Sequence, residues 1–137
     1  MTGHSLGDTA HEDEINQLVE SGFDINSKDA NETTLLHKFT KKGNVIGVKS
    51  LLEHEADFNV TDNENRNPLH YAIIHGHKKI AKLLINQLTI NSRDKNGFTP
   101  LHLAALRDDT ELIDFLIANM GQKLMKKMLK RAILRFI

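Results

Sequence analysis

Apolar residues recur along the middle of this chain in short runs with helical spacing, and the runs come in pairs. The first run of each pair opens after a polar residue, which is Thr34, Asn67 or Thr99. The second runs cover 48–52, 80–85 and 112–117. Apolar positions three and four residues apart predict a helix with one buried face, and threonine and asparagine are favoured N-caps. The pattern therefore predicts three antiparallel pairs of short helices.

Glycines and turn-forming residues punctuate these runs. Gly43 and Gly76 stand where the first helix of a pair should end, and Asp108 takes that place in the third copy. Helices commonly end in a left-handed residue, a conformation that glycine adopts freely and aspartate tolerates. The polar stretch before each pair, such as 94–98, has the composition of a tight turn. Each copy should therefore carry two helices and a projecting loop.

Two short strings of residues repeat in step. The first ends in a histidine, with copies 33 and 32 residues apart: Thr34-Leu35-Leu36-His37, Asn67-Pro68-Leu69-His70 and Thr99-Pro100-Leu101-His102. Proline at 68 and 100 fits the first position of a helix, where the amide needs no partner. The second string ends in an asparagine that an aspartate follows three residues later: Asn26, Asn59 and Asn91. Two markers with one period indicate a repeated structural unit.

This period and this motif resemble the ankyrin repeat, whose core reads T-P-L-H-x-A. The match is nearly complete over 94–105, and the resemblance covers roughly 12–121. It implies an all-α fold, an ankyrin-repeat solenoid of helix pairs with projecting β-hairpin-like loops. It also implies that His37, His70 and His102 are structural residues that brace adjacent loops. The local departures are Leu35 for proline, Glu32 and Asn65 for the turn glycine, and Gly47, which should weaken its helix.

The domain organisation follows from the repeat. We expect a flexible segment at 1–11, an N-terminal half-repeat at 12–26, repeats at about 27–59, 60–91 and 92–121, and a basic amphipathic helix at 122–137. This tail holds six of the eighteen basic residues and no acid, so the zero net charge combines an acidic body with a basic end. Three roles fit it: packing on the last repeat, binding an anionic membrane, or binding an acidic protein. Nucleic acid is an unlikely partner because the body would repel phosphates.

The sequence offers little support for catalytic or metal chemistry. It contains no cysteine, which removes thiolate ligands and nucleophiles. The histidines at 70, 75 and 77 lack a carboxylate or thiolate at ligand spacing. The repeat itself explains the recurring histidines and aspartates, so no nucleophile, base and orienting group remain to be assigned. We therefore expect no enzyme activity, no metal and no cofactor. The N-terminus does not resemble a secretory signal, which favours a cytoplasmic or nuclear location.

The resemblance implies protein binding along a concave face made by the loop tips and the exposed side of each first helix. The residues at these places are Ala30, Asn31, Thr33, Lys41 and Lys42, then Asn63, Glu64, Arg66, Ile74 and His75, then Lys95, Asn96, Phe98, Leu106 and Arg107. Ile74, Phe98 and Leu106 are large apolar groups where the fold requires none, so together with Arg107 they are the predicted hot spot. Alternatively, Phe98 and Leu106 pack on each other and on the neighbouring loop.

The expected function is that of a noncatalytic adaptor or inhibitor that binds one protein. Two alternatives resemble it closely: a short inhibitor similar to those of NF-κB-type transcription factors, and a pathogen effector that imitates host ankyrin proteins. A third alternative is a membrane-associated scaffold anchored by residues 122–137.

Overall fold

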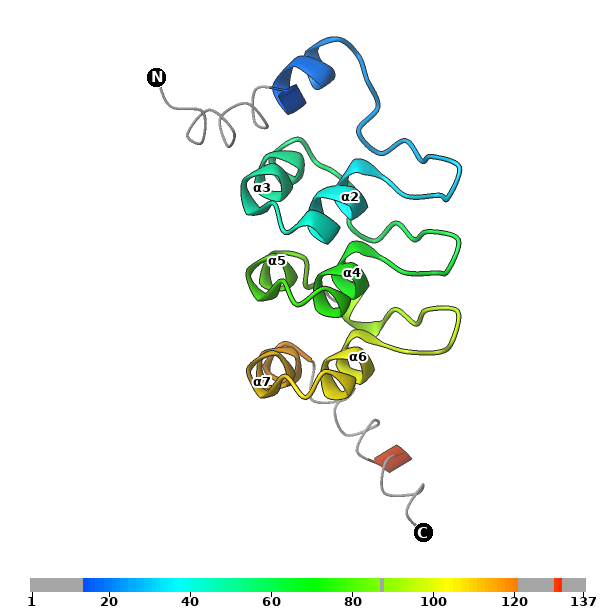
Figure 1. The fold of residues 1–137 in the computed structure, drawn as a ribbon, viewed down its shortest axis with the longest axis vertical. Coiled ribbons are helices and arrows are strands. Elements are labelled where there is room, and N and C mark those ends of the chain that lie inside the picture. The colour runs from blue at the N-terminus through cyan, green and yellow to red at the C-terminus, as the bar shows by residue number, and fades with distance from the viewer. Residues whose placement is uncertain (1–13, 87, 121–129, 132–137) are drawn as a thin grey trace.

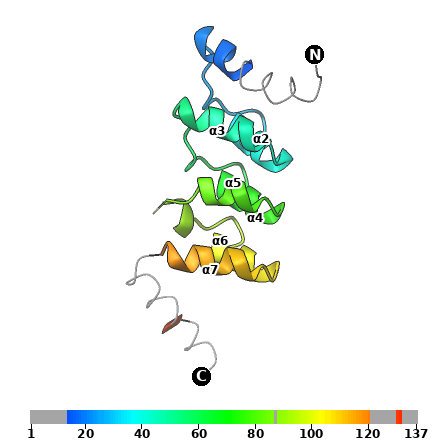
Figure 2. The ribbon, with the colours of Figure 1, turned by 90° about the vertical axis from the view of Figure 1, so that its left-hand side faces the viewer.

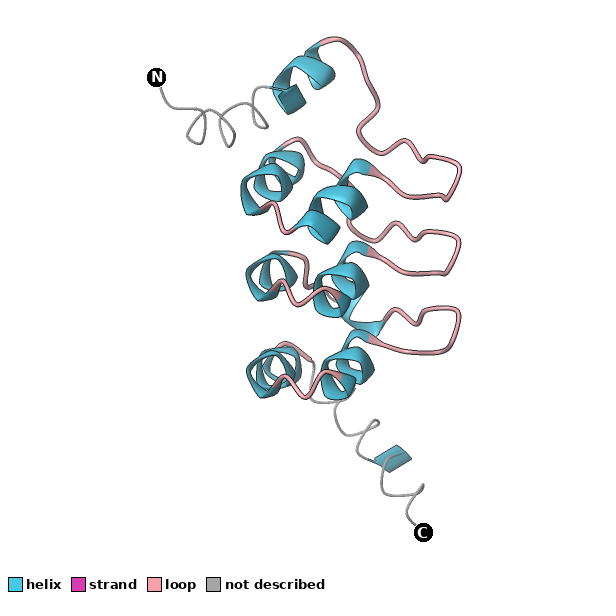
Figure 3. Ribbon diagram, in the orientation of Figure 1, coloured by secondary structure: helices cyan, strands magenta, loops and turns pink. Residues whose placement is uncertain are grey.

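The computed structural model describes residues 14–86, 88–120 and 130–131. The paired helices are α2 (Leu35–Lys42) with α3 (Val45–Glu53), α4 (Pro68–Ile74) with α5 (Lys78–Leu83), and α6 (Pro100–Leu106) with α7 (Thr110–Ala118). A helix over 14–20 precedes them, and the short 3-10 helix η1 (Thr89–Asn91) follows α5. The described residues contain no strand (Figure 3). The predicted all-α fold of helix pairs is confirmed.

The three helix pairs stack as layers of a solenoid. The first helices α2, α4 and α6 form one row, the second helices α3, α5 and α7 form another, and the loops project beyond the first row (Figure 1). In a view rotated by 90° about the vertical axis, the helix pairs form parallel layers, one above the next (Figure 2). Consecutive repeats therefore present the same elements side by side.

The core lies between the layers. Leu51, Ile80 and Leu112 come from the three second helices, and each is at most 1% exposed. Leu36 and Leu69 from the first helices are equally buried. Fully burying a leucine or isoleucine contributes about 1.5–3 kcal/mol. Because each apolar face is covered by the neighbouring repeat, the stability of one layer depends on the next.

The repeated histidine completes the cap of each first helix. Thr34, Asn67 and Thr99 are the N-caps, and the side chain of each accepts a hydrogen bond from the backbone amide three residues later. That residue is always the histidine, whose ring Nδ1 accepts in return from the N-cap amide at 3.1–3.2 Å. Two amides that would otherwise lack partners at the helix start are thereby satisfied.

The residues predicted to end the first helices have the left-handed backbone conformation. Gly43 and Gly76 have φ values of 77° and 74°, and Asp108 adopts 56°. At the loop turns, Glu32 and Asn65 take up φ values of 63° and 59°. This conformation costs a non-glycine residue roughly 1–2 kcal/mol. The first two loops therefore hold strain that the third, with glycine at this position, avoids.

Gly47 has a packing role that the sequence does not reveal. It is buried within α3, and a Cβ atom there would lie 2.6 Å from Cδ2 of Phe39. Carbon atoms do not approach so closely without repulsion. The glycine weakens the intrinsic propensity of α3, as expected, and at the same time allows α3 to lie close against α2.

Candidate partner-binding surface

The three projecting loops share one turn. Asp29, Asp62 and Asp94 each receive two backbone hydrogen bonds on Oδ1, from the residues two and four positions later, at 2.8–3.0 Å. A further backbone bond joins each aspartate amide to the carbonyl four residues later. Hydrogen bonds from Thr33, led by its hydroxyl, hold the pKa of Asp29 well below its usual range. The aspartates are therefore structural, and they fix the shape of the loop tips.

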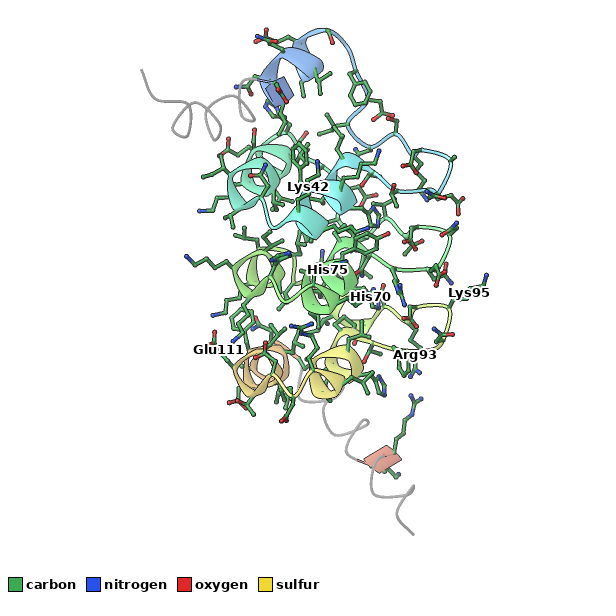
Figure 4. The ribbon with its side chains drawn as sticks, in the orientation of Figure 1. Lys42, His70, His75, Arg93, Lys95 and Glu111 are labelled. Atoms are coloured by element: carbon green, nitrogen blue, oxygen red, sulfur yellow. The ribbon has the colours of Figure 1, made fainter. Side chains whose placement is uncertain are left out.

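Successive loops are tied to one another through the backbone. The amide of Asn63 donates to the carbonyl of Asn31 at 3.2 Å, and the amide of Lys95 donates to that of Glu64 at 2.8 Å. The side chains at these four tip positions remain exposed, and Lys95 projects from the third loop in Figure 4. The four predicted contact residues joined by these bonds therefore form one aligned row.

The motif histidines His37 and His70 each contact the loop of the following repeat. Nε2 of His37 lies 2.9 Å from the carbonyl of Arg66, and Nε2 of His70 lies 3.1 Å from that of Phe98. Both rings are fully buried, and burial lowers the pKa of each. Because Nδ1 accepts, the neutral ring must donate from Nε2. Both histidines therefore hydrogen-bond within the fold through both ring nitrogens, and their bracing role stays a prediction.

Arg66 has a comparable bracing position. Its Nε lies 3.5 Å from Oδ2 of Asp94, a carboxylate that is almost fully buried in the next loop. The side chain of Arg66 is only partly exposed. This predicted contact residue therefore also connects two loops of the array.

A second row of predicted residues lies at the C-terminal ends of the first helices. Arg107 donates from Nη1 to the carbonyl of Ile74 at 2.8 Å, and its guanidinium lies over Gly76, where a Cβ atom would be 2.7 Å from Nη2. One layer earlier, Nε2 of His77 lies 3.1 Å from the carbonyl of Lys41 and its ring covers Gly43. A basic side chain from the following repeat thus reaches the same carbonyl position at two helix ends.

The structure separates the predicted hot spot into two places. Leu106 is 70% exposed and ends α6 beside Arg107, while Ile74 is partly buried against the core. Phe98 precedes the N-cap of α6, is partly buried, and has its ring 6.2 Å from that of His102. A seven-residue helix, about 10 Å long, separates Phe98 from Leu106. These two residues therefore do not form one apolar patch.

A row of rings crosses the first helices, and sequence reasoning missed its central member, Tyr71. The ring of Tyr71 lies 4.8 Å from His37 and 6.3 Å from His75, and the ring of His75 stacks on His77 at 6.4 Å. The Tyr71 hydroxyl donates to Oδ2 of Asp62, which ties the row to the second loop. Tyr71 takes the unspecified position of the motif T-P-L-H-x-A, directly after the histidine. A large aromatic residue at this position was the sequence feature that could have identified it.

Opposite charges pair on the row of second helices. Nζ of Lys78 lies 3.5 Å from Asp109 and 3.7 Å from Glu111, and Nζ of Lys82 lies 3.2 Å from Glu111. Lys82 also lies over the ring of Phe115, 5.3 Å from its centre. Asp109 and Glu111, at the start of α7, therefore pair with Lys78 and Lys82 of α5.

The described residues contain no group of three or more His, Asp or Glu side chains arranged to hold a metal ion. Within the same part of the chain, no helix has both the length and the apolar composition needed to cross a bilayer. The predicted flexible segment at 1–11 lies outside the described residues. So does the predicted tail helix, apart from Lys130 and Arg131, which are exposed. The roles suggested for the tail stay predictions.

Comparisons with known proteins agree with the repeat geometry. Models of ankyrin repeats match residues 7–94 and 86–117. Dog inversin is 34% identical over 103 residues, which cover 73% of this chain and 10% of inversin. A putative ankyrin repeat protein of fowlpox virus is 34% identical over 112 residues, 77% of this chain and 33% of its own length. The human transient receptor potential channel A1 is 28% identical over 75% of this chain and 10% of its own.

The chain thus spans between a tenth and a third of the length of these relatives. The first family match alone covers more than half of the chain, and the capping histidines and left-handed turns of that family are all in place. The chain belongs to the ankyrin-repeat family.

Proposed function

We propose that this chain is a noncatalytic adaptor or inhibitor that binds a protein partner along its loop tips and the ends of its first helices, the concave face expected for such an array. The observation that carries the proposal is the alignment of successive repeats. Backbone bonds between loops, at Asn31 to Asn63 and Glu64 to Lys95, place variable side chains in one row. Members of this family are in general protein-interaction modules.

The use of the polar groups supports a noncatalytic role. His37 and His70 engage both ring nitrogens in hydrogen bonds within the fold. Asp29 and Asp62 are occupied by backbone amides of their own loops. A general base needs a free lone pair within reach of a substrate proton. These side chains are instead committed to holding the surface in shape.

The preformed surface favours tight binding by one partner. Loop tips that are already fixed lose little conformational freedom on association, so less of the interaction energy is spent on ordering them. Interfaces of standard size bury about 800 Å² on each partner. The two rows extend over three repeats, and this is where an interface of that kind is proposed to form.

The test is affinity capture with matched pairs of variants, each bait being checked for unchanged thermal melting. One bait carries Asn63→Ala and Lys95→Ala at the loop tips. The control bait carries Lys49→Ala and Lys79→Ala, two exposed residues of the second helices. A protein captured by the wild type and the control bait but lost from the loop-tip bait supports the proposal. Equal recovery by all three baits, or loss only from the control bait, would place the binding surface elsewhere.

A further inference from the structure

The ends of the first helices carry an excess of positive charge. The residues concerned, called the helix-end cluster below, are Lys41, Lys42, His75, His77 and Arg107. Lys41, Lys42, His75 and Arg107 are exposed, and His77 is partly so. Lys42 and His75 lie at the ends of α2 and α4, one layer apart (Figure 4). Lysines of the first repeat, histidines of the second and an arginine of the third therefore share one side of the stack.

The members of the helix-end cluster interact with one another. Burial lowers the pKa of His75, and the positive charges of Lys41, His77 and Arg107 lower it further. The rings of His75 and His77 stack, and His77 contacts the turn that follows Lys41. Lys41 and Arg107 therefore make the surroundings of His75 electropositive, although the chain as a whole carries no net charge.

Acidic side chains are absent from the helices that bear this cluster. α2, α4 and α6 contain no aspartate or glutamate. The first acids after α6 are Asp108 and Asp109, and Asp109 already lies 3.5 Å from Lys78. Among the described residues, no carboxylate forms an ion pair with Lys41, Lys42 or Arg107. Elsewhere among the described residues, Lys38, Lys78 and Lys82 do have such partners, whereas the exposed Lys49, Lys79 and Lys95 do not.

Part of this charge has a structural explanation. Lys41 and Lys42 lie in the last turn of α2, where cations interact favourably with the helix dipole. Arg107 satisfies the carbonyl of Ile74. These contacts account for each cation separately, yet Lys41 and Arg107 both act on His75, so cations of different repeats repel one another across this surface. An anionic ligand would relieve that repulsion.

We propose that the helix-end cluster binds an acidic segment of the partner protein, in extended form, across α2, α4 and α6. This inference rests on the proposed function and adds the chemistry of the partner. Neighbouring helices pack about 8–10 Å apart, so the ends of α2 and α6 lie about 20 Å apart. An extended chain advances about 3.3 Å per residue. A segment of about six residues rich in aspartate and glutamate therefore spans the cluster.

The binding test uses the full chain and a fluorescent hexaglutamate peptide, followed by fluorescence anisotropy at low and at physiological salt. The test variant is Lys41→Gln with Lys42→Gln. Two matched variants remove the same charge elsewhere: Lys49→Gln with Lys79→Gln on the second helices, and Lys126→Gln with Lys127→Gln in the basic tail. Removing two exposed charge contacts should weaken binding about tenfold, while the matched variants stay within about twofold of the wild type. Binding should also weaken at higher salt.

Four results would overturn the inference. The wild type could fail to bind hexaglutamate at all. All three variants could weaken the binding equally, which would indicate nonspecific charge attraction. The binding could be lost only with Lys126→Gln and Lys127→Gln, which would assign acidic ligands to the tail. Oligothymidylate or phosphatidylserine vesicles could bind the cluster as tightly as the peptide, which would remove the preference for protein carboxylates.

The proposed function is tested separately. A captured partner could be lost from the loop-tip bait and yet bind equally well to the Lys41→Gln, Lys42→Gln variant and at high salt. In that case the adaptor function stands, and the proposal that an acidic segment binds the helix-end cluster is wrong. If hexaglutamate binds as described but no captured protein depends on the loop tips, the proposed binding face is wrong and the helix-end cluster remains an acid-binding site.

Discussion

Replacing His70 by alanine should destabilise the fold far more than replacing His75, although the two histidines are only five residues apart. His70 is fully buried, its Nδ1 accepts from the amide of Asn67 at 3.1 Å, and its Nε2 donates to the carbonyl of Phe98 at 3.1 Å. Alanine leaves the amide of Asn67 without this partner and removes one of the two hydrogen bonds that the carbonyl of Phe98 accepts, because the amide of Asp94 still donates to that carbonyl. An unsatisfied buried group costs about 1–3 kcal/mol and a lost hydrogen bond about 0.5–1.5 kcal/mol, so the total loss should be about 2–4 kcal/mol once the small cavity is included.

His75 is exposed and contributes only ring contacts with Tyr71 and His77. Its replacement by alanine should cost less than about 0.5 kcal/mol, as for most surface substitutions. Urea unfolding followed by circular dichroism at equilibrium gives both values. A small domain is stable by only about 5–15 kcal/mol, so His70→Ala should shift the midpoint strongly. Losses for the two variants that agree within about 1 kcal/mol would refute the bracing role assigned to the motif histidine.

Three further predictions concern single residues and pH. Glu32→Gly should raise the free energy of unfolding by about 0.5–1 kcal/mol, because glycine relieves the left-handed strain, whereas Glu64→Gly in the next loop should not; thermal melting compares them. Gly47→Ala should destabilise by about 1 kcal/mol despite better helix propensity, because the added Cβ meets the phenylalanine ring of α2; a melting temperature above that of the wild type would contradict this. The lowered pKa values of His37 and His70 mean that the unfolded chain binds more protons as the pH falls below about 6.5. Stability should therefore be complete above that pH and decline below it, with a shallower decline in the His70→Ala variant; urea midpoints between neutral and mildly acid pH measure the slope.

The sequence by itself determined the features that depend on neighbouring residues in the chain. The N-caps, the left-handed turns at Gly43 and Asp108, and the loop turns closed by Asp62 are local hydrogen-bonding arrangements within about five residues. Such arrangements leave a direct signature in residue type, and a fixed period repeats that signature three times. For this reason the helix pairs, their order and the family could be predicted with no structure.

Only the tertiary structure decided which residues of different elements meet. The bond from Arg107 to Ile74, the ring row through Tyr71 and the approach of α3 to α2 at Gly47 all depend on how one element packs against another. A residue's type does not state which carbonyl or ring the next layer will present, so Phe98 and Leu106 could be expected to form one hot spot when they lie at opposite ends of α6. Stacking also brings together cations that are scattered along the chain, because charge adds up in space and not along the sequence.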